Sequence, residues 1–239
     1  MMEAVRSAGY SPTLLSFREP SSKPKSKLLP AIRTSLYPYI ESEIPVILVM
    51  YTPELGGHAV VLIGHGWLEK PLLCVPIVIR RDNKALYIRN TVDWATPFYM
   101  HNDNTGPYLP IQDTGKKEEY TLDKVCYAIP LLPADVYMTA EEAEQISIRM
   151  ICNAAGDGFL NNKAHLVRTY LQERYKFREQ VIEGGMVDIL KKHYRMQNLP
   201  RRMRITEINL QEGSDNPQEG KAKRIGEVII DPTGEPTLG

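Results

Sequence analysis

His58 is the side chain of this sequence best placed to do chemistry. It follows the pair Gly56-Gly57 and opens the apolar segment Ala59 to Ile63, which is typical of a strand. An imidazole can accept and donate a proton near neutral pH, so a histidine at the mouth of a sheet can act as a general base. The glycine pair permits a positive φ angle or a close backbone approach, which suits a cleft wall. Trp67 could cover the imidazole and exclude water. The alternative interpretation is an ordinary, partly buried histidine on a strand.

Asn102 and Asp103 are the side chains that could orient His58. They begin the polar turn 102–106, directly after a segment, Thr96 to His101, that we expect to form a strand. In thiol hydrolases a cysteine thiolate attacks a carbonyl, a histidine moves the proton, and an Asn or Asp orients the histidine. We therefore interpret His58, with Asn102 or Asp103, as the second and third members of such a catalytic group.

The cysteines that could complete this group are Cys74, Cys126 and Cys152, and all three follow His58. Cys74 and Cys126 lie in apolar runs, where a cysteine acts as a small hydrophobic residue. Cys152 lies near the C-terminal end of an expected helix, where the helix dipole would raise the pKa of a thiol. None is therefore predicted to be the nucleophile. Their spacing indicates no disulfide framework and no metal site, and we expect no metal and no other cofactor.

The other four histidines are interpreted as structural or surface residues. His65 lies past the expected end of the strand and is predicted to be a turn residue. His101 could line the same cleft as Asn102, but a structural role is the simpler interpretation. His165 and His193 lie on expected helices.

The segment from Ile44 to Trp67 and the later turn resemble the papain-like cysteine peptidases of the bacteriocin-processing (double-glycine) group. That family has a proline and an apolar strand, here Pro45 to Val49. A loop and a pattern of His, Ala or Phe, Val, Val, two apolar residues and Gly follow, here His58 to Gly64. The family then carries an Asp with a glycine four residues later, a spacing that falls here on Asn102 and Gly106, with Asp103 adjacent.

The resemblance implies a papain-like thiol hydrolase, a peptidase or amide hydrolase, over roughly residues 1 to 110. The family begins with a Cys-Gly-Pro type of helix start, and MMEAVRSAG matches the end of that helix. It therefore places the cysteine a few residues before Met1, and implies a chain that is truncated before its nucleophile or has lost it. Such a chain is expected to be inactive as given. A non-catalytic binding or regulatory protein built on the same scaffold is the alternative.

The composition limits the other classes of function. The chain of 239 residues has 29 basic and 29 acidic side chains, which leaves no electrostatic footprint for nucleic acid or an anionic membrane. Its apolar runs are too short to span a bilayer, and its first ten residues lack the apolar stretch of a signal peptide. We expect a cytoplasmic protein whose substrate or partner is a peptide or a protein. The sequence assigns no oligomeric state.

Residues 1–115 are expected to form a papain-like half-domain, made of a helix remnant and a mostly antiparallel sheet. Gly9 is expected to end the first helix, and Pro76 to place its strand at a sheet edge. The expected helices are 1–8 and 30–40, and the expected strands are 11–17, 46–51, 58–64, 72–80, 85–90 and 96–101.

Residues 120–239 are expected to form a smaller α+β domain of unassigned role, after a charged boundary at 113–119. Thr139 and Glu142 have the spacing of a capping box, which predicts a helix start. The expected strands are 124–132, 202–210 and 223–231, the last two paired as a hairpin, and the expected helices are 139–153, 166–181 and 186–196. The predicted fold class is therefore α+β.

Overall fold

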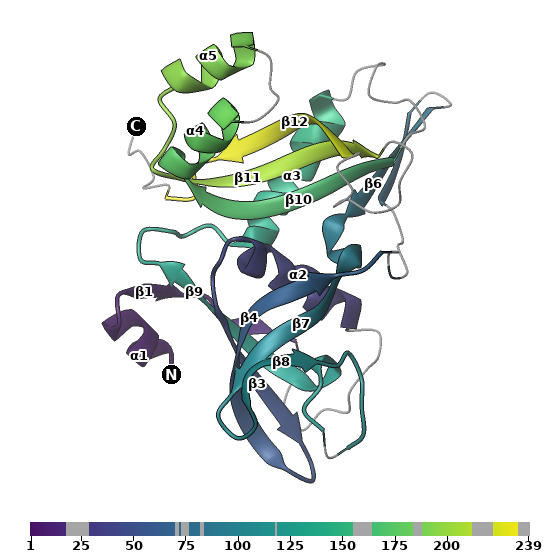
Figure 1. The fold of residues 1–239 in the computed structure, drawn as a ribbon, viewed down its shortest axis with the longest axis vertical. Helices are drawn as coiled ribbons and strands as arrows, with labels where there is room; N and C mark the ends of the chain where they lie inside the picture. The colour runs from purple at the N-terminus through teal and green to yellow at the C-terminus, as the bar shows by residue number, and fades with distance from the viewer. Residues whose placement is uncertain are drawn as a thin grey trace.

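The computed structural model has the expected α+β architecture, with two β-sheets and five α-helices among the described residues (Figure 1). The structure describes residues 1–17, 29–69, 72, 77–81, 84–117, 119–154, 164–183, 188–211 and 222–233. Figure 1 shows one sheet above the other, with α2 (Leu29–Glu41) between them. Within these residues, no helix has both the length and the apolar character needed to cross a membrane.

Seven strands form the first sheet, in the order β1-β9-β3-β4-β7-β8, with β2 also paired to β9. All of its strand pairs are antiparallel. A short helix, α1, precedes β1, and Gly9 follows it with a φ of +84°, which ends the helix as expected. The bounds are α1 (Met2–Ser7), β1 (Tyr10–Pro12), β2 (Leu15–Ser16), β3 (Val46–Thr52), β4 (Gly56–Trp67), β7 (Ala95–Asn102), β8 (Gly106–Ile111) and β9 (Val125–Pro133).

The largest core forms between the first sheet and α2. Burial alternates along β3, so that Val46, Leu48 and Met50 share one face and are fully buried. On α2, Ile32 and Leu36 are buried one helical turn apart and belong to the same apolar cluster. The face of the sheet that carries Met50 is therefore the inner face.

Five strands form the second sheet, in the order β12-β11-β10-β6-β5. The pairing of β6 with β10 is parallel, and the other pairs are antiparallel. As expected, β5 lies at an edge and β11 pairs with β12. The bounds are β5 (Ile77–Arg81), β6 (Lys84–Asn90), β10 (Ala164–Glu173), β11 (Arg202–Gln211) and β12 (Ala222–Ile230). The helices of this half are α3 (Ala140–Ala154), α4 (Arg174–Glu183) and α5 (Asp188–Met196).

The boundary that the sequence predicts at 113–119 does not divide the strands of the first sheet from those of the second. β5 and β6 lie between β4 and β7 in the sequence, yet they belong to the second sheet, and β9 follows the charged segment but returns to the first. Short 3-10 helices, Thr91–Trp94 and Leu122–Lys124, lead the chain back into β7 and β9. The division into 1–115 and 120–239 therefore does not describe how the strands assemble into sheets.

The expected helix 166–181 is wrong over its first half, which is β10. Leu166, Val167, Tyr170 and Leu171 are all buried, a spacing that also fits one face of a helix. β10 lies inside its sheet, and Val167, Tyr170 and Leu171 belong to three different apolar clusters. A strand covered on both faces has no alternation of apolar and polar residues, so the sequence lacked the signal of a strand.

The other expected elements of this half agree with the structure. Thr139 and Glu142 form the predicted capping box, with Glu142 N donating to Thr139 Oγ1 at 3.2 Å and Thr139 N donating to Glu142 Oε2 at 2.9 Å. α4 occupies the second half of the expected helix 166–181, and α5 ends at Met196 as expected.

Candidate functional site

His58 is placed by the hairpin of β3 and β4. The Thr52 hydroxyl accepts a hydrogen bond from Leu55 N at 2.9 Å, which closes the turn between these strands. Gly56 leaves the turn with a φ of +79°, a conformation that favours glycine, whereas Gly57 has no such angle. No atom lies within 4 Å of a Cβ built on either glycine, so the pair serves the turn and not a close backbone approach.

The sheet register puts His58 on the inner face. His58 pairs with Met50 across β3 and β4, and directly paired residues of an antiparallel sheet point to the same side. On the neighbouring strand, Leu62 pairs with Met100, so Asn102 lies on the same face two residues later. The side chain of His58 is 13 % exposed, and Asn102 is buried. The predicted proximity of these two residues is therefore present.

The hydrogen bonds of Asn102 fix the tautomer of His58. Asn102 Oδ1 lies 3.0 Å from His58 Nε2 and 3.0 Å from the backbone nitrogen of Asn104. The backbone N–H of Asn104 can only donate, so the Asn102 atom that it faces must be the oxygen. That oxygen can only accept, so His58 Nε2 must carry the hydrogen. In the neutral ring, Nδ1 therefore keeps its lone pair and can accept a proton.

Asp103 lies next to this pair in a weaker position. Its Oδ1 is 3.5 Å from His58 Nε2, and its side chain is 79 % exposed, so solvent screens its attraction for an imidazolium. Gly106, four residues after Asn102, ends the turn with a φ of +119°. Of the two predicted orienting residues, Asn102 makes the hydrogen bond to His58.

Tyr120, and not Trp67, covers the His58 ring. The ring centroids of His58 and Tyr120 are 4.9 Å apart with an interplanar angle of 37°. Trp67, at the far end of β4, instead contacts His65 of the same strand and Tyr37 of α2. The expectation that Trp67 covers His58 is therefore wrong. The reason is distance along the strand: nine residues of extended chain separate His58 from Trp67, roughly 30 Å.

The segment that carries Tyr120 is tied to the sheet by backbone and side-chain bonds. Leu122 N donates to Gln112 O at 2.9 Å, and Lys124 Nζ donates to Glu119 O at 2.7 Å. Arg33 of α2 binds Asp113 at 2.7 Å and also donates to Ala95 O. This segment is thus held at both ends, with Tyr120 against His58.

Neither described cysteine faces His58. Met50 pairs with His58 on one side and with Val125 on the other, so β3 separates Cys126 from His58 by two strand spacings, roughly 10 Å. Cys126 is fully buried, as expected for a small hydrophobic residue. Cys152 lies on α3, and burial raises the pKa of its thiol. The third cysteine, Cys74, lies outside the described residues.

His65 is part of an ionic network and is not the turn residue that was expected. It lies within β4, which continues past Gly64 through bulges, and pairs with Phe98. Its Nε2 is 2.6 Å from Glu41 Oε1 and its Nδ1 is 2.8 Å from Gly66 O. His65 thus connects β4 to the end of α2.

The same network connects the two sheets. Glu41, at the end of α2, also binds Arg168 of β10 at 3.2 Å. Arg168 continues to Glu207 of β11 at 2.9 Å, and Glu207 to Arg224 of β12 at 2.9 Å. The sequence carries no local signal for these pairs, because their members are far apart in the chain.

The remaining histidines have the following positions. His101 is exposed on the outer face of the sheet, against Tyr108. It lines one hollow together with Asn102, as the sequence allowed, but it does not face His58. His165 is buried on β10, a strand and not the expected helix, and His193 is exposed on α5. Across the part of the chain that the structure describes, no group of three or more His, Cys, Asp or Glu side chains could hold a metal ion.

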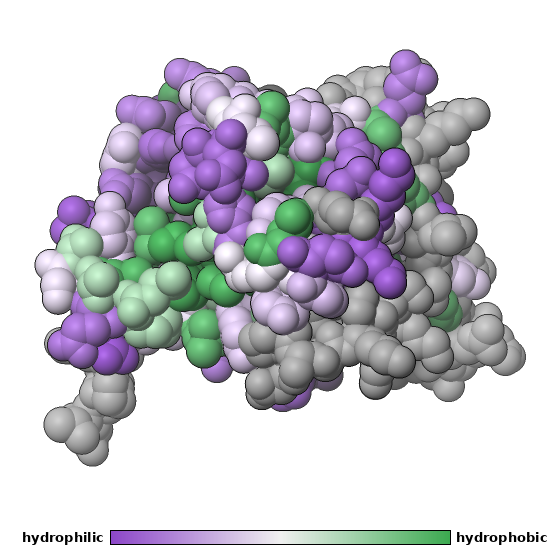
Figure 2. Space-filling view, turned by 90° about the horizontal axis from the view of Figure 1, so that it is seen from below, coloured by the Kyte–Doolittle hydropathy of each residue, from purple (hydrophilic) through white to green (hydrophobic). Residues whose placement is uncertain are grey.

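The surface around the two hairpins is partly apolar and hollowed. A hollow of about 570 Å³ lies beside the turn after β7, and its lining includes Ala59, Val61, His101 and Asn102 but not His58. Leu55, in the turn before His58, is 49 % exposed. Figure 2, which views the molecule from below, shows hydrophobic and hydrophilic surface side by side on this end of the molecule.

Comparison with models of known protein families found no match for this chain. Comparisons with curated proteins and with solved structures found no match either.

Proposed function

We propose that His58 and Asn102 are the base and the orienting residue of a papain-like thiol hydrolase site. The observation that carries this proposal is the hydrogen bond from His58 Nε2 to Asn102 Oδ1. It holds the imidazole with Nδ1 available, which is the arrangement that a cysteine–histidine pair needs. Tyr120 supports the same role, because a ring packed against the imidazole limits its rotation and its access to water.

In this mechanism a cysteine thiol gives its proton to His58 Nδ1, and the thiolate attacks the carbonyl carbon of an amide. The C–N bond breaks as the imidazolium returns its proton to the leaving nitrogen, which leaves a thioester. Water then attacks the thioester carbon while Nδ1 takes its proton, and the thiol and a carboxylic acid are released. Asn102 stays hydrogen-bonded to Nε2 throughout and stabilises the charged ring.

The thiol belongs, in this proposal, to a helix upstream of Met1, where the resemblance to the double-glycine peptidases places it. Cys126 is buried behind β3 and Cys152 lies on α3, so neither is within reach of Nδ1. Cys126 and Cys152 are therefore expected to support no thiol-dependent hydrolysis. A peptide or a protein is the substrate that the resemblance implies.

A non-catalytic binding or regulatory role on the same scaffold is the second candidate. The observation in its favour is the position of the two described cysteines, which leaves His58 without a thiol among the described residues. Under this role, a bound peptide partner would be retained when His58 is changed to Ala.

The test compares the protein extended by its upstream coding sequence with three variants, using iodoacetamide labelling at neutral pH and mass spectrometry. We expect one upstream cysteine to be labelled rapidly, and His58→Ala and Asn102→Ala to slow its labelling. His101→Ala is the matched control, because His101 precedes Asn102 on β7 and its side chain lies on the outer face of the sheet, opposite to His58. The proposal is contradicted if the extended, folded protein has no rapidly labelled cysteine. It is also contradicted if the rate of labelling is unchanged in His58→Ala.

A further inference from the structure

α5 exposes its apolar side chains to solvent. Ile189 and Met196 are both 77 % exposed, Leu190 is 44 % exposed, and no residue of this helix is buried. A helix of nine residues is marginally stable in water, and such a helix normally gains stability by burying an apolar face. Figure 1 shows α5 at the upper end of the molecule, beyond α4 and the second sheet. Its apolar residues are therefore accessible to a partner that would bury them.

The contact with α4 determines which side of α5 faces outward. Tyr194 packs edge-on against Phe177 of α4, with the ring centroids 5.3 Å apart. With about 3.6 residues per turn, Met196 lies on the opposite side of α5 from Tyr194, and Ile189 lies two turns before Met196. Ile189, Lys192 and Met196 also line one open hollow. The outward side of α5 thus combines two apolar side chains with an ammonium group.

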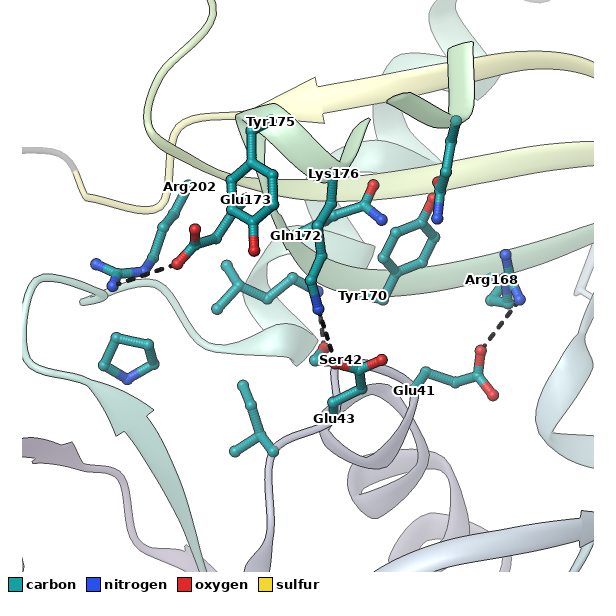
Figure 3. Close-up of a pocket in the computed structure, with 14 residues that line it drawn as sticks. Glu41, Ser42, Glu43, Arg168, Tyr170, Gln172, Glu173, Tyr175, Lys176 and Arg202 are labelled. Carbon is teal, nitrogen blue, oxygen red and sulfur yellow. Dashed lines mark hydrogen bonds and ion pairs between the residues drawn. The ribbon is translucent and has the colours of Figure 1, made fainter. Parts of the chain in front are cut away.

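The same helix carries more positive than negative charge. Its charged side chains are one carboxylate and three cations: Asp188, Lys191, Lys192 and Arg195. None of these three cations forms an ion pair with another described residue. On α4, by contrast, the ammonium of Lys176 already binds Glu43 at 2.9 Å (Figure 3). The cations of α5 are therefore available to an external anionic group.

The charge of this end of the molecule differs from that of the whole chain. Between Arg174 and Arg202 the sequence has eight basic and three acidic side chains, whereas the whole chain has 29 of each. The rest of the chain is therefore acidic in total, and an anionic surface would attract this end and repel the rest. The expectation of no electrostatic footprint for an anionic membrane used the net charge alone, which hides this basic segment.

We propose that α5 docks on the surface of an anionic phospholipid membrane. Ile189 and Met196 would enter the boundary between headgroups and acyl chains, while Lys192 and Arg195 bind the anionic headgroups. A helix that lies in the plane of a membrane has this combination of apolar and basic side chains. Nucleic acid fits less well, because cations and stacked aromatic rings bind it, whereas the exposed apolar side chains of α5 are aliphatic. The surface needs no thiol and is independent of the function proposed for His58.

The test is co-sedimentation of the 239-residue protein with two kinds of lipid vesicle. One is pure phosphatidylcholine, and the other contains about one-third phosphatidylserine, both at about 0.15 M salt. A Lys or Arg near an anionic surface strengthens binding roughly fivefold, so we expect binding at least roughly tenfold tighter to the vesicles with phosphatidylserine. Equal binding to both vesicles would indicate apolar adhesion alone. That result, or no binding to either vesicle, overturns the proposal.

Two double variants test the assigned contacts. Ile189→Ser with Met196→Ser changes two highly exposed positions, so folding is not at risk, and it is expected to weaken binding to the anionic vesicles at least roughly tenfold. Lys192→Gln with Arg195→Gln is expected to weaken it roughly twentyfold. Unchanged binding after the serine substitutions would mean that no apolar side chain enters the membrane, which contradicts the proposal.

The controls separate this surface from general exposure and from a general affinity for polyanions. Leu14→Ser and Lys117→Gln change exposed residues of the other half of the molecule and are expected to leave vesicle binding unchanged. A short DNA duplex is expected to compete poorly with the anionic vesicles. A duplex that binds as tightly as those vesicles would identify a nucleic-acid surface and overturn the assignment to lipid.

Discussion

The raised pKa of Glu144 predicts that the protein loses stability as the pH rises through the neutral range. It lies on α3, and burial raises the pKa of its carboxyl from 4.5 to about 7. The negative charge of the nearby Glu141 contributes to this increase in pKa. Hydrogen bonds from Asn90, at 3.0 Å, and from Thr169 lower the pKa and so oppose it. The folded protein therefore holds this proton at pH values where the unfolded chain has released it.

The sign and the size of the effect follow from proton linkage. Below about pH 4.5 both states are protonated, and the contribution of Glu144 is fully present. Between that value and about pH 7 the unfolded state ionises first, so the free energy of unfolding falls with rising pH. The step from 4.5 to about 7 corresponds to about 3 kcal/mol.

The assay is urea denaturation of the wild type and Glu144→Gln at about pH 5 and about pH 8. Other ionisable groups also titrate, so the quantity of interest is the difference between the two proteins at each pH. We expect Glu144→Gln to gain roughly 2–3 kcal/mol relative to the wild type at the higher pH. Glu179→Gln, at an exposed position on α4, is the control and is expected to show no such gain. A difference between wild type and Glu144→Gln that does not change with pH would refute the reasoning.

Three other perturbations have expected outcomes. Arg168→Met should destabilise the fold by roughly 1.5–3 kcal/mol in urea denaturation, because Glu41 and Glu207 lose the guanidinium that they share, although Glu207 keeps its ion pair with Arg224. Adding Glu41→Gln should restore part of the loss, and a loss below about 1 kcal/mol would show that the network contributes little. Thr139→Ala should cost about 1 kcal/mol of unfolding free energy by removing the cap of α3, and an unchanged urea midpoint would contradict that role. Tyr120→Leu should speed the reaction of His58 with diethyl pyrocarbonate without unfolding the protein, whereas an unchanged rate would mean that Tyr120 does not shield the ring.

The sequence predicted those elements whose two faces differ. β3 and β4 were found because apolar residues follow Pro45 and the Gly56-Gly57 pair, and α3 because Thr139 and Glu142 have the spacing of a cap. β10 was missed because it is buried on both faces, which removes the alternation that marks a strand. The assignment of β9 to the first sheet was missed because pairing with β3 is a long-range contact without a local signal.

The candidate site could be predicted in part for the same reason. His58 lies near the start of β4 and Asn102 at the end of β7, and the antiparallel pairing of these strands brings both residues to one edge of the sheet. Tyr120 could not be predicted, because the segment that carries it returns to His58 through contacts with α2 and with the start of β9. The network of His65 joins elements more than 100 residues apart, and no local pattern encodes such pairs.

The most direct test of the central claim is the tautomer of His58, measured by nitrogen-15 NMR on the protein as it stands. We predict that the neutral ring carries its hydrogen on Nε2, with Nδ1 unprotonated, and that Asn102→Ala mixes the two tautomers while His101→Ala leaves the signal unchanged. A neutral ring with its hydrogen on Nδ1 in the wild-type protein would contradict the account, because that nitrogen could not accept a proton from a thiol.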